Sequence, residues 1–137
     1  MYLLLALLSA LTAALVAMFG KMGLQGVDSV LATTVRGIIM AVVLTIVSVA
    51  TGRFATIGTI SGRAWWMIML AGISGAASWL AYFLALKFGP ATHVAAVDRL
   101  SIVFVIALAA LFLGESFTWK LALGGTFMAM GAILIVM

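Results

Sequence analysis

The sequence predicts an all-α membrane protein with five transmembrane helices, and three observations carry that prediction. Of the 137 residues, 67% are apolar and 7% are charged, and the mean hydropathy is +1.41. A soluble domain carries about 25% charged residues, so this chain has too few to cover a water-facing surface. Apolar stretches of about 20 residues, the length that crosses a bilayer, recur along the chain with short polar breaks between them.

The expected spans follow one another with little room between them. The first has no basic segment before it and runs unbroken to Gly20, which favours a retained helix over a cleaved signal peptide. The spans are expected at about residues 2–20, 29–51, 64–86, 91–113 and 118–136. Together they make a single transmembrane domain over residues 1–137.

Each break between spans has residues that begin or end a helix. Asp28 is placed to cap the second span. The longest loop, residues 54–62, is rich in Thr, Gly and Ser. The four residues from Lys87 to Pro90 allow only a tight reversal between antiparallel helices. Residues 114–118 separate the last two spans.

Composition also excludes several classes of function. Cysteine is absent, which rules out disulfides and thiol catalysis. One His and three carboxylates show no metal-ligand spacing, and no phosphate-binding loop motif is present. We therefore expect no metal, no cofactor and no enzyme activity. The net charge of +4 comes from basic residues scattered singly, which suits lipid headgroups rather than nucleic acid.

The basic residues are distributed almost evenly over the two membrane faces. An odd number of spans puts the termini on opposite faces. The N-terminal face receives Arg53, Arg63 and Lys120, and the other face receives Lys21 and Lys87. Orientation normally follows an excess of Lys and Arg on the cytoplasmic side, and here there is almost none. We therefore expect insertion in both orientations and an antiparallel homodimer, which is an inverted repeat of ten helices.

Three patches, in order along the chain, carry a resemblance to a known family. They are Phe19-Gly20-Lys21 followed by Ala32-Thr33-Thr34-Val35-Arg36; the run from Ala81 to Ala91, with Tyr82, Lys87 and Pro90; and Leu111-Phe112-Leu113-Gly114-Glu115 with Thr118 and Gly124. On these residues the chain resembles a half-size, five-helix member of the EamA-like carriers in the drug/metabolite transporter superfamily. The family often has a proline in its fourth helix, about where Ile102 stands here.

The resemblance implies a fold and a function. Full-length members of the family have ten helices, built as two inverted repeats of five. A five-helix member would therefore assemble from two copies. The resemblance implies a multi-pass transporter of the cell (inner) membrane of a bacterium or archaeon.

Three ionisable residues, Arg36, Asp98 and Arg99, stand inside the apolar spans. Each costs about 2.5–3.5 kcal/mol on insertion scales, so such residues normally mark a substrate or proton pathway. Arg36 is eight residues beyond Asp28, and Asp98 is eight beyond Pro90. Both should therefore lie about 12 Å below one face. Asp98 and Arg99 are neighbours about 100° apart on a helix, so Arg36 is the better partner for Asp98.

The alternatives for these charges stay open. The Arg36–Asp98 pair can carry transport or only lock helices together. Arg99 can bind an anion or a backbone carbonyl, or extend to a lipid headgroup. Ser101, three residues after Asp98, can bond that carboxylate or its own backbone.

Aromatic and small residues complete the candidate site. Trp79 reaches the depth of Arg36, and Tyr82 follows it on the same helical face. The two rings can form a cavity wall that stacks on substrate, or they can simply pack between helices. Gly124 and Gly131 are seven residues apart on the last helix and suit a dimer interface.

These residues favour secondary transport of a small anionic or zwitterionic organic metabolite by alternating access, and export in particular. Asp98 would be the coupling acid, because substrate that displaces it from Arg36 would let it take up a proton. One alternative is a multidrug exporter, with Asp98 holding a lipophilic cation and Trp79 stacking on it. The other is a non-transporting membrane subunit whose charges serve assembly with a partner protein.

Overall fold

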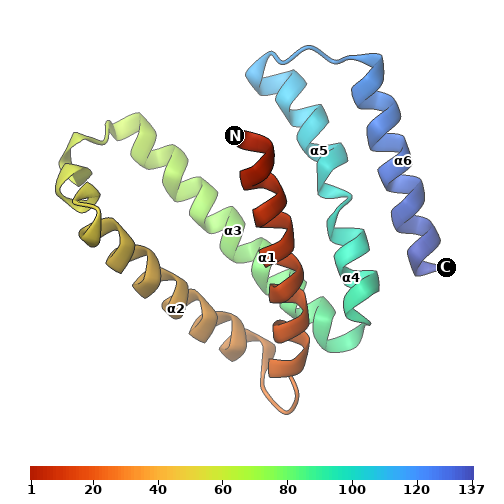
Figure 1. Cartoon of the computed structure of the whole chain (residues 1–137), viewed down its shortest axis with the longest axis horizontal. Coiled ribbons are helices and arrows are strands. Elements are labelled where there is room, and N and C mark those ends of the chain that lie inside the picture. Colours follow the sequence, from red (N-terminus) through yellow and green to blue (C-terminus); the bar gives the residue numbers. More distant parts are fainter. The chain divides into compact units, whose positions relative to one another are not determined.

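A computed structural model describes all residues, 1–137, and is helical throughout with no strand (Figure 1). Four of the crossings are single helices: α1 (Tyr2–Gly23), α2 (Ser29–Ala50), α3 (Gly62–Phe88) and α6 (Trp119–Val136). The other, Ala91–Leu113, is built in pieces. All five are long and apolar enough to cross a membrane, which confirms the predicted class and number of helices.

The chain forms two compact units. Unit 1 combines Met1–Met18 with Phe88–Met137, and unit 2 is Phe19–Lys87. Unit 2 therefore holds the end of α1 together with α2 and α3. Unit 1 holds α4 (Ala91–Asp98), α5 (Ser101–Leu108) and α6.

The start of α2 is set by Asp28, as the sequence predicts. Its side chain accepts hydrogen bonds from the backbone N–H groups of Val30 and Leu31, at 2.9 and 3.1 Å. These donors have no partner within the helix, so the cap fixes where α2 begins. At its other end α2 is followed by a 3₁₀ helix, η1 (Arg53–Thr59), which occupies most of the expected loop.

The end of α1 packs closely on the last turns of α3 within unit 2. A Cβ at Gly20 would lie 3.2 Å from Cζ of Phe83 and 3.4 Å from Cδ1 of Leu86, so only glycine fits there without displacing a neighbour. The next residue, Lys21, donates a hydrogen bond from Nζ to the backbone oxygen of Leu86. A cation at the C-terminal end of a helix also stabilises the helix dipole. This contact holds the two helix ends together.

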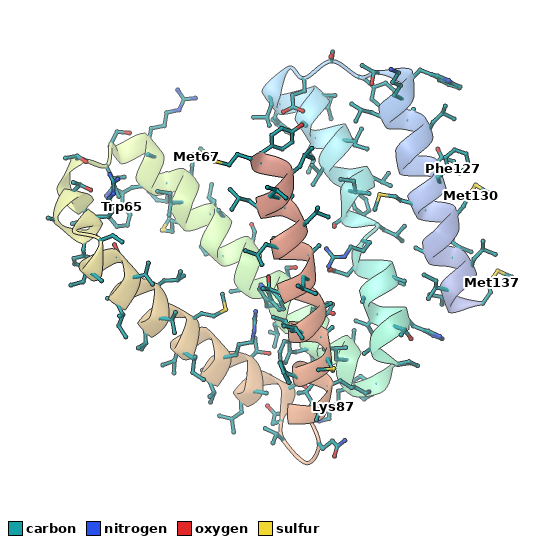
Figure 2. All side chains as sticks on the ribbon, viewed as in Figure 1. Trp65, Met67, Lys87, Phe127, Met130 and Met137 are labelled. Carbon is teal, nitrogen blue, oxygen red and sulfur yellow. The ribbon has the colours of Figure 1, made fainter.

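The two ends of α3 carry the residues expected at membrane interfaces. Figure 2 shows Trp65 near the first turn of α3 and Lys87 near its last turn. Trp65 is half-exposed. Trp rings favour the headgroup level, and Lys favours the aqueous side of it. The length of α3 between Trp65 and Lys87 is therefore the part that we assign to the bilayer.

In unit 1, α6 packs against both α4 and α5. Thr118 caps α6 by accepting a hydrogen bond from Leu121 N at 3.3 Å. Gly125 faces α5, since a Cβ there would lie 3.3 Å from Cδ1 of Ile106. Phe127 and Met130 point away from α5 (Figure 2). α6 thus has one packed face and one free face.

The Ala91–Leu113 crossing is interrupted between α4 and α5, where the sequence predicts one span. Leu100 N donates to Val97 O at 2.9 Å, Ile102 N to Arg99 O, and Val103 N to Leu100 O. These bonds reach back three residues instead of four, so the helix tightens locally into a 3₁₀ turn. No proline or glycine stands at this point. Asp98 ends α4 and Ser101 begins α5.

The same crossing ends in a π-helical turn, η2 (Ala109–Leu113). Glu115 N reaches back to Ala109 O at 3.3 Å. Gly114 has φ +65°, a left-handed conformation that glycine adopts without steric cost. The family-like run of residues 111–115 is therefore a helix end, and Gly114 is needed for its backbone geometry.

Candidate functional site

A groove of about 500 Å³ lies between α2 and α3 within unit 2. Its volume is in the range of about 300–1,000 Å³ that is typical of small-molecule sites. Most of its lining is apolar. The lining residues are Val30, Thr33, Thr34, Arg36, Gly37 and Met40 from α2, and Gly72, Gly75, Ala76, Trp79 and Leu80 from α3.

Arg36 stacks on Trp79 in this groove. The guanidinium carbon lies 3.5 Å from the centre of the Trp79 ring and 5.5 Å from that of Phe83. A guanidinium over an indole face is attracted by the ring quadrupole, at about 0.5–2 kcal/mol. Stacking covers the flat face of the guanidinium and leaves its N–H edges for hydrogen bonds. The contact therefore orients Arg36 without using its donors.

Trp79 is the centre of a small aromatic cluster on α3. Its ring meets Tyr82 edge-on, with centroids 5.6 Å apart and an interplanar angle of 75°. It also meets Phe83 at 6.2 Å and 62°. Such edge-to-face pairs are favourable and limit ring rotation. The cluster therefore holds the Trp79 face towards Arg36, and Phe83 links it to the packing around Gly20.

Unit 2 has no carboxylate at the groove. Its one acidic residue is Asp28, whose Oδ1 is used to cap α2. The groove itself is lined by one guanidinium, one indole and two hydroxyls, with no carboxylate, imidazole or thiolate to bind a metal ion. The charge that unit 2 places in the groove is thus positive.

The two hydroxyls in the lining are already committed as donors. Thr33 Oγ1 donates to Ser29 O at 2.7 Å, and Thr34 Oγ1 donates to Val30 O at 2.8 Å. A hydroxyl with its proton in use can still accept a hydrogen bond. The free donors offered by α2 in the groove are therefore those of Arg36.

The remaining predicted site residues belong to unit 1. Asp98 is the last residue of α4, Arg99 follows it in the interruption, and Ser101 opens α5. All three therefore lie at the point where this crossing changes its hydrogen-bond spacing. Arg36 is in unit 2, so the predicted pairing of Arg36 with Asp98 stays a prediction.

Gly124 and Gly131 lie on α6, and a Cβ at either would meet nothing within 4 Å. They therefore differ from Gly125, which packs on Ile106. Their face of α6 is open within the chain. Their role in a dimer interface also stays a prediction.

Sequence reasoning missed the part of the groove that α2 supplies. Thr33, Gly37 and Met40 line it at spacings of four and three, the signature of one helical face. The same spacing in the sequence, on either side of Arg36, could have identified this face of α2 as part of the site. Phe83 was missed as well, although it follows Tyr82 directly and contacts Trp79.

Comparison with known proteins identifies the family of the chain. The model of the EamA-like transporter family matches residues 1–137. The chain is 44% identical over 130 residues to a protein of Sinorhizobium sp named "Uncharacterized transporter in cobO 3'region", covering 95% of this chain and 92% of that one. No solved structure matches the chain. With a match over its whole length and five helices suited to a membrane, the chain belongs to the EamA-like transporter family.

Proposed function

We propose that this multi-pass membrane transporter carries a small organic anion or zwitterion, outward across the membrane, by alternating access. The observation that carries the proposal is Arg36, held on Trp79 in a largely apolar groove. No carboxylate of its own unit stands beside it. A guanidinium in such a site is stabilised by an anion that accepts from its N–H edges.

The stacking geometry disfavours the multidrug alternative. A lipophilic cation would need the face of Trp79, and the guanidinium of Arg36 already lies over that face at 3.5 Å. Two cations on one ring would repel each other in a medium of low dielectric constant. An anion meets no such conflict. A non-transporting subunit would not need a groove of this size.

We place the working protein in the cell membrane of a bacterium or archaeon as an antiparallel homodimer. The near-equal distribution of basic residues over the two faces supports insertion both ways. The open face of α6 around Gly124 and Gly131 supports a helix–helix contact between copies. The Sinorhizobium relative, which this chain matches over 92% of its length, supports the bacterial assignment.

We assign proton coupling to Asp98. It ends α4 at the interruption of an otherwise apolar crossing, and discontinuous helices typically form the substrate and coupling-ion sites of transporters. When Arg36 is free of substrate, Asp98 would be its counter-ion. Substrate would take the guanidinium, and the carboxylate would then accept a proton. One negative charge and one proton would thus cross together, and a high concentration of the anion inside would drive the export.

Flux in proteoliposomes that contain only this chain tests the proposal. Vesicles of phosphatidylcholine would be loaded with a mixture of labelled organic anions, zwitterions and lipophilic cations, and release of each would be followed. We expect saturable release of an anion or zwitterion, and loss of that release in Arg36→Gln. Arg53→Gln, which removes the same charge from η1 outside the groove, is the matched control.

The other possible results of this flux experiment would each contradict the proposal in a different way. Release of cations alone, unchanged by Arg36→Gln, would mean a multidrug carrier. No saturable flux of any class, from protein shown to be folded and inserted, would mean a non-transporting subunit. Equal loss in Arg36→Gln and Arg53→Gln would mean that the groove is not the site.

A further inference from the structure

The groove between α2 and α3 has a feature that the proposed anion site alone does not require: three of its lining residues are glycines. Gly37 comes from α2, and Gly72 and Gly75 come from α3. A Cβ built at any of them would meet nothing within 4 Å. None of the three is in a left-handed conformation either. Within the chain, neither close packing nor backbone geometry therefore requires glycine at these positions.

Glycine in a helix has a cost that something must offset. Each glycine within a helix is less favourable than alanine by about 1 kcal/mol. Gly20 and Gly125 offset that cost by close packing, with neighbours at 3.2 and 3.3 Å from an ideal Cβ. Gly72 and Gly75 have no such neighbour. What they supply is empty volume on the wall of the groove.

The position of that volume relative to Arg36 defines the shape of the ligand. Gly72, Gly75 and Trp79 follow one another at spacings of three and four on α3, so they lie along one face of the helix. Trp79 holds Arg36 at 3.5 Å. The glycines therefore begin one turn away from the guanidinium. A ligand whose anionic group binds Arg36 has its body directed along them.

The polar groups of the groove also favour one charge type. An ammonium group needs a carboxylate or several acceptors. The one carboxylate of unit 2 is engaged in capping α2, and Asp98, by the proposal above, is protonated once substrate holds Arg36. Thr33 and Thr34 offer one acceptor oxygen each. Burying an ammonium beside Arg36 with only these partners is unfavourable. Of the two substrate classes above, a monoanion fits this groove better than a zwitterion.

We infer that the transported solute is an organic monoanion with an aromatic or branched aliphatic body, and that Gly72 and Gly75 set the size of that body. This inference rests on the anion site proposed for Arg36. Carboxylates are the simplest monoanions of this kind, and their planar group matches the fork of a guanidinium. Fatty acids of the bilayer share this chemistry, so they must be distinguished from soluble carboxylates.

Binding to the full-length protein in nanodiscs of phosphatidylcholine tests the inference. The probes are acetate, benzoate, 3-phenylpropionate, phenylalanine and palmitate, with affinity measured by displacement of radiolabelled 3-phenylpropionate. We expect 3-phenylpropionate to bind about tenfold or more tightly than phenylalanine. We expect Gly75→Val to weaken 3-phenylpropionate by about tenfold while leaving acetate unchanged. Gly72→Val should also weaken binding of 3-phenylpropionate and leave that of acetate unchanged.

Gly62→Val at the start of α3, outside the groove, is the matched control, because a Cβ there also meets nothing. It should leave all affinities unchanged. The inference is overturned if phenylalanine binds as tightly as 3-phenylpropionate, if the groove variants leave the size preference unchanged, or if they weaken acetate and 3-phenylpropionate equally. Palmitate that displaces the label at far lower concentration than unlabelled 3-phenylpropionate does would assign the groove to lipid and overturn the inference too.

Failure of the underlying anion site would look different. In that case no carboxylate binds the wild-type protein, or Arg36→Gln leaves binding unchanged. Gly75→Ala, a smaller change that should also raise helix stability, separates exclusion from misfolding. It should weaken 3-phenylpropionate less than Gly75→Val does and should melt no lower than the wild type. A Gly75→Ala protein that melts well below the wild type would show that Gly75 is a packing residue and would overturn the inference.

Discussion

The guanidinium carbon of Arg36 lies 3.5 Å from the ring centre of Trp79, which joins α2 to α3 across the groove. The two residues are 43 positions apart, so the contact depends on the tertiary arrangement of unit 2. It also gives a charged side chain at bilayer depth an electrostatic partner that is not a carboxylate. Within unit 2 the charge of Arg36 is therefore stabilised but not neutralised, which leaves its N–H groups available to an anion.

Replacing Trp79 should loosen Arg36 and weaken anion binding. Trp79→Leu removes a cation–π interaction of about 0.5–2 kcal/mol, so we expect anion affinity to fall by a factor of about 2 to 30. Trp79→Phe keeps an aromatic face and should lose less. Affinity would be measured by displacement of a labelled carboxylate in nanodiscs. Trp66→Leu, at an exposed position on α3, is the control. The same loss in both leucine variants would show that stacking on Arg36 is not the cause.

The contact between Lys21 and Leu86 predicts a change in stability rather than in binding. Lys21→Met removes the donor to the carbonyl of Leu86, a fully buried residue near the end of α3. We expect a loss of about 1–3 kcal/mol in the free energy of unfolding, seen as a lower melting temperature in nanodiscs. Lys120→Met, at an exposed position on α6, should leave the melting temperature unchanged. An unchanged Lys21→Met protein would mean that α1 is held to α3 by packing at Gly20 alone.

The helices and their caps were predictable from the sequence because each has a local cause. Hydropathy identifies the five crossings, and an Asp directly before an apolar run identifies the cap at Asp28. Counting residues from the helix ends places Arg36 and Trp79 at one depth, and the structure brings them into contact. Distance along a helix is fixed by its rise per residue, so depth can be read from sequence.

The rest could not be predicted, since it depends on how helices face one another. Thr33, Gly37 and Met40 line the groove, but small and apolar residues are equally suited to facing lipid. The interruption after Asp98 could not be predicted, because no proline or glycine stands there in the sequence. In an apolar span, lipid and protein select the same residue types, so the pattern that marks a buried face in a soluble helix is absent.

The even distribution of basic residues predicts that copies insert in both orientations. Single cysteines at Gln25 and Gly58 would be labelled on intact cells with an impermeant thiol reagent; both positions are exposed and the chain has no cysteine of its own. Each site should be about half labelled, because no excess of Lys and Arg selects one orientation. Full labelling of one site with none of the other would exclude the antiparallel dimer.

The shared depth of Arg36 and Asp98 predicts that they are partners in the substrate-free protein. Removing one member of a buried pair costs about 3–5 kcal/mol, whereas removing both leaves no uncompensated charge. Arg36→Met should therefore lower the melting temperature sharply, and Arg36→Met combined with Asp98→Asn should recover part of the loss. Arg99→Met combined with Asp98→Asn is the matched comparison and should show no recovery. Additive losses for Arg36 and Asp98 in the double-mutant cycle would mean that they do not interact.

Asp98 is the one acidic residue within the membrane-spanning helices. The other two acidic residues lie outside them: Asp28 caps α2, and Glu115 follows the end of η2. If Asp98 carries the coupled proton, Asp98→Asn should abolish uptake driven by a pH gradient in proteoliposomes. Downhill exchange of labelled solute should persist, because Arg36 and Trp79 still form the binding groove. Glu115→Gln, which also removes one carboxylate, should keep both activities. Protein yield and dimer content must be matched among the three proteins, because misfolding would remove both activities together. Gradient-driven uptake that survives in a folded Asp98→Asn protein would leave Asp98 as a structural partner of Arg36, with the proton carried elsewhere or not at all.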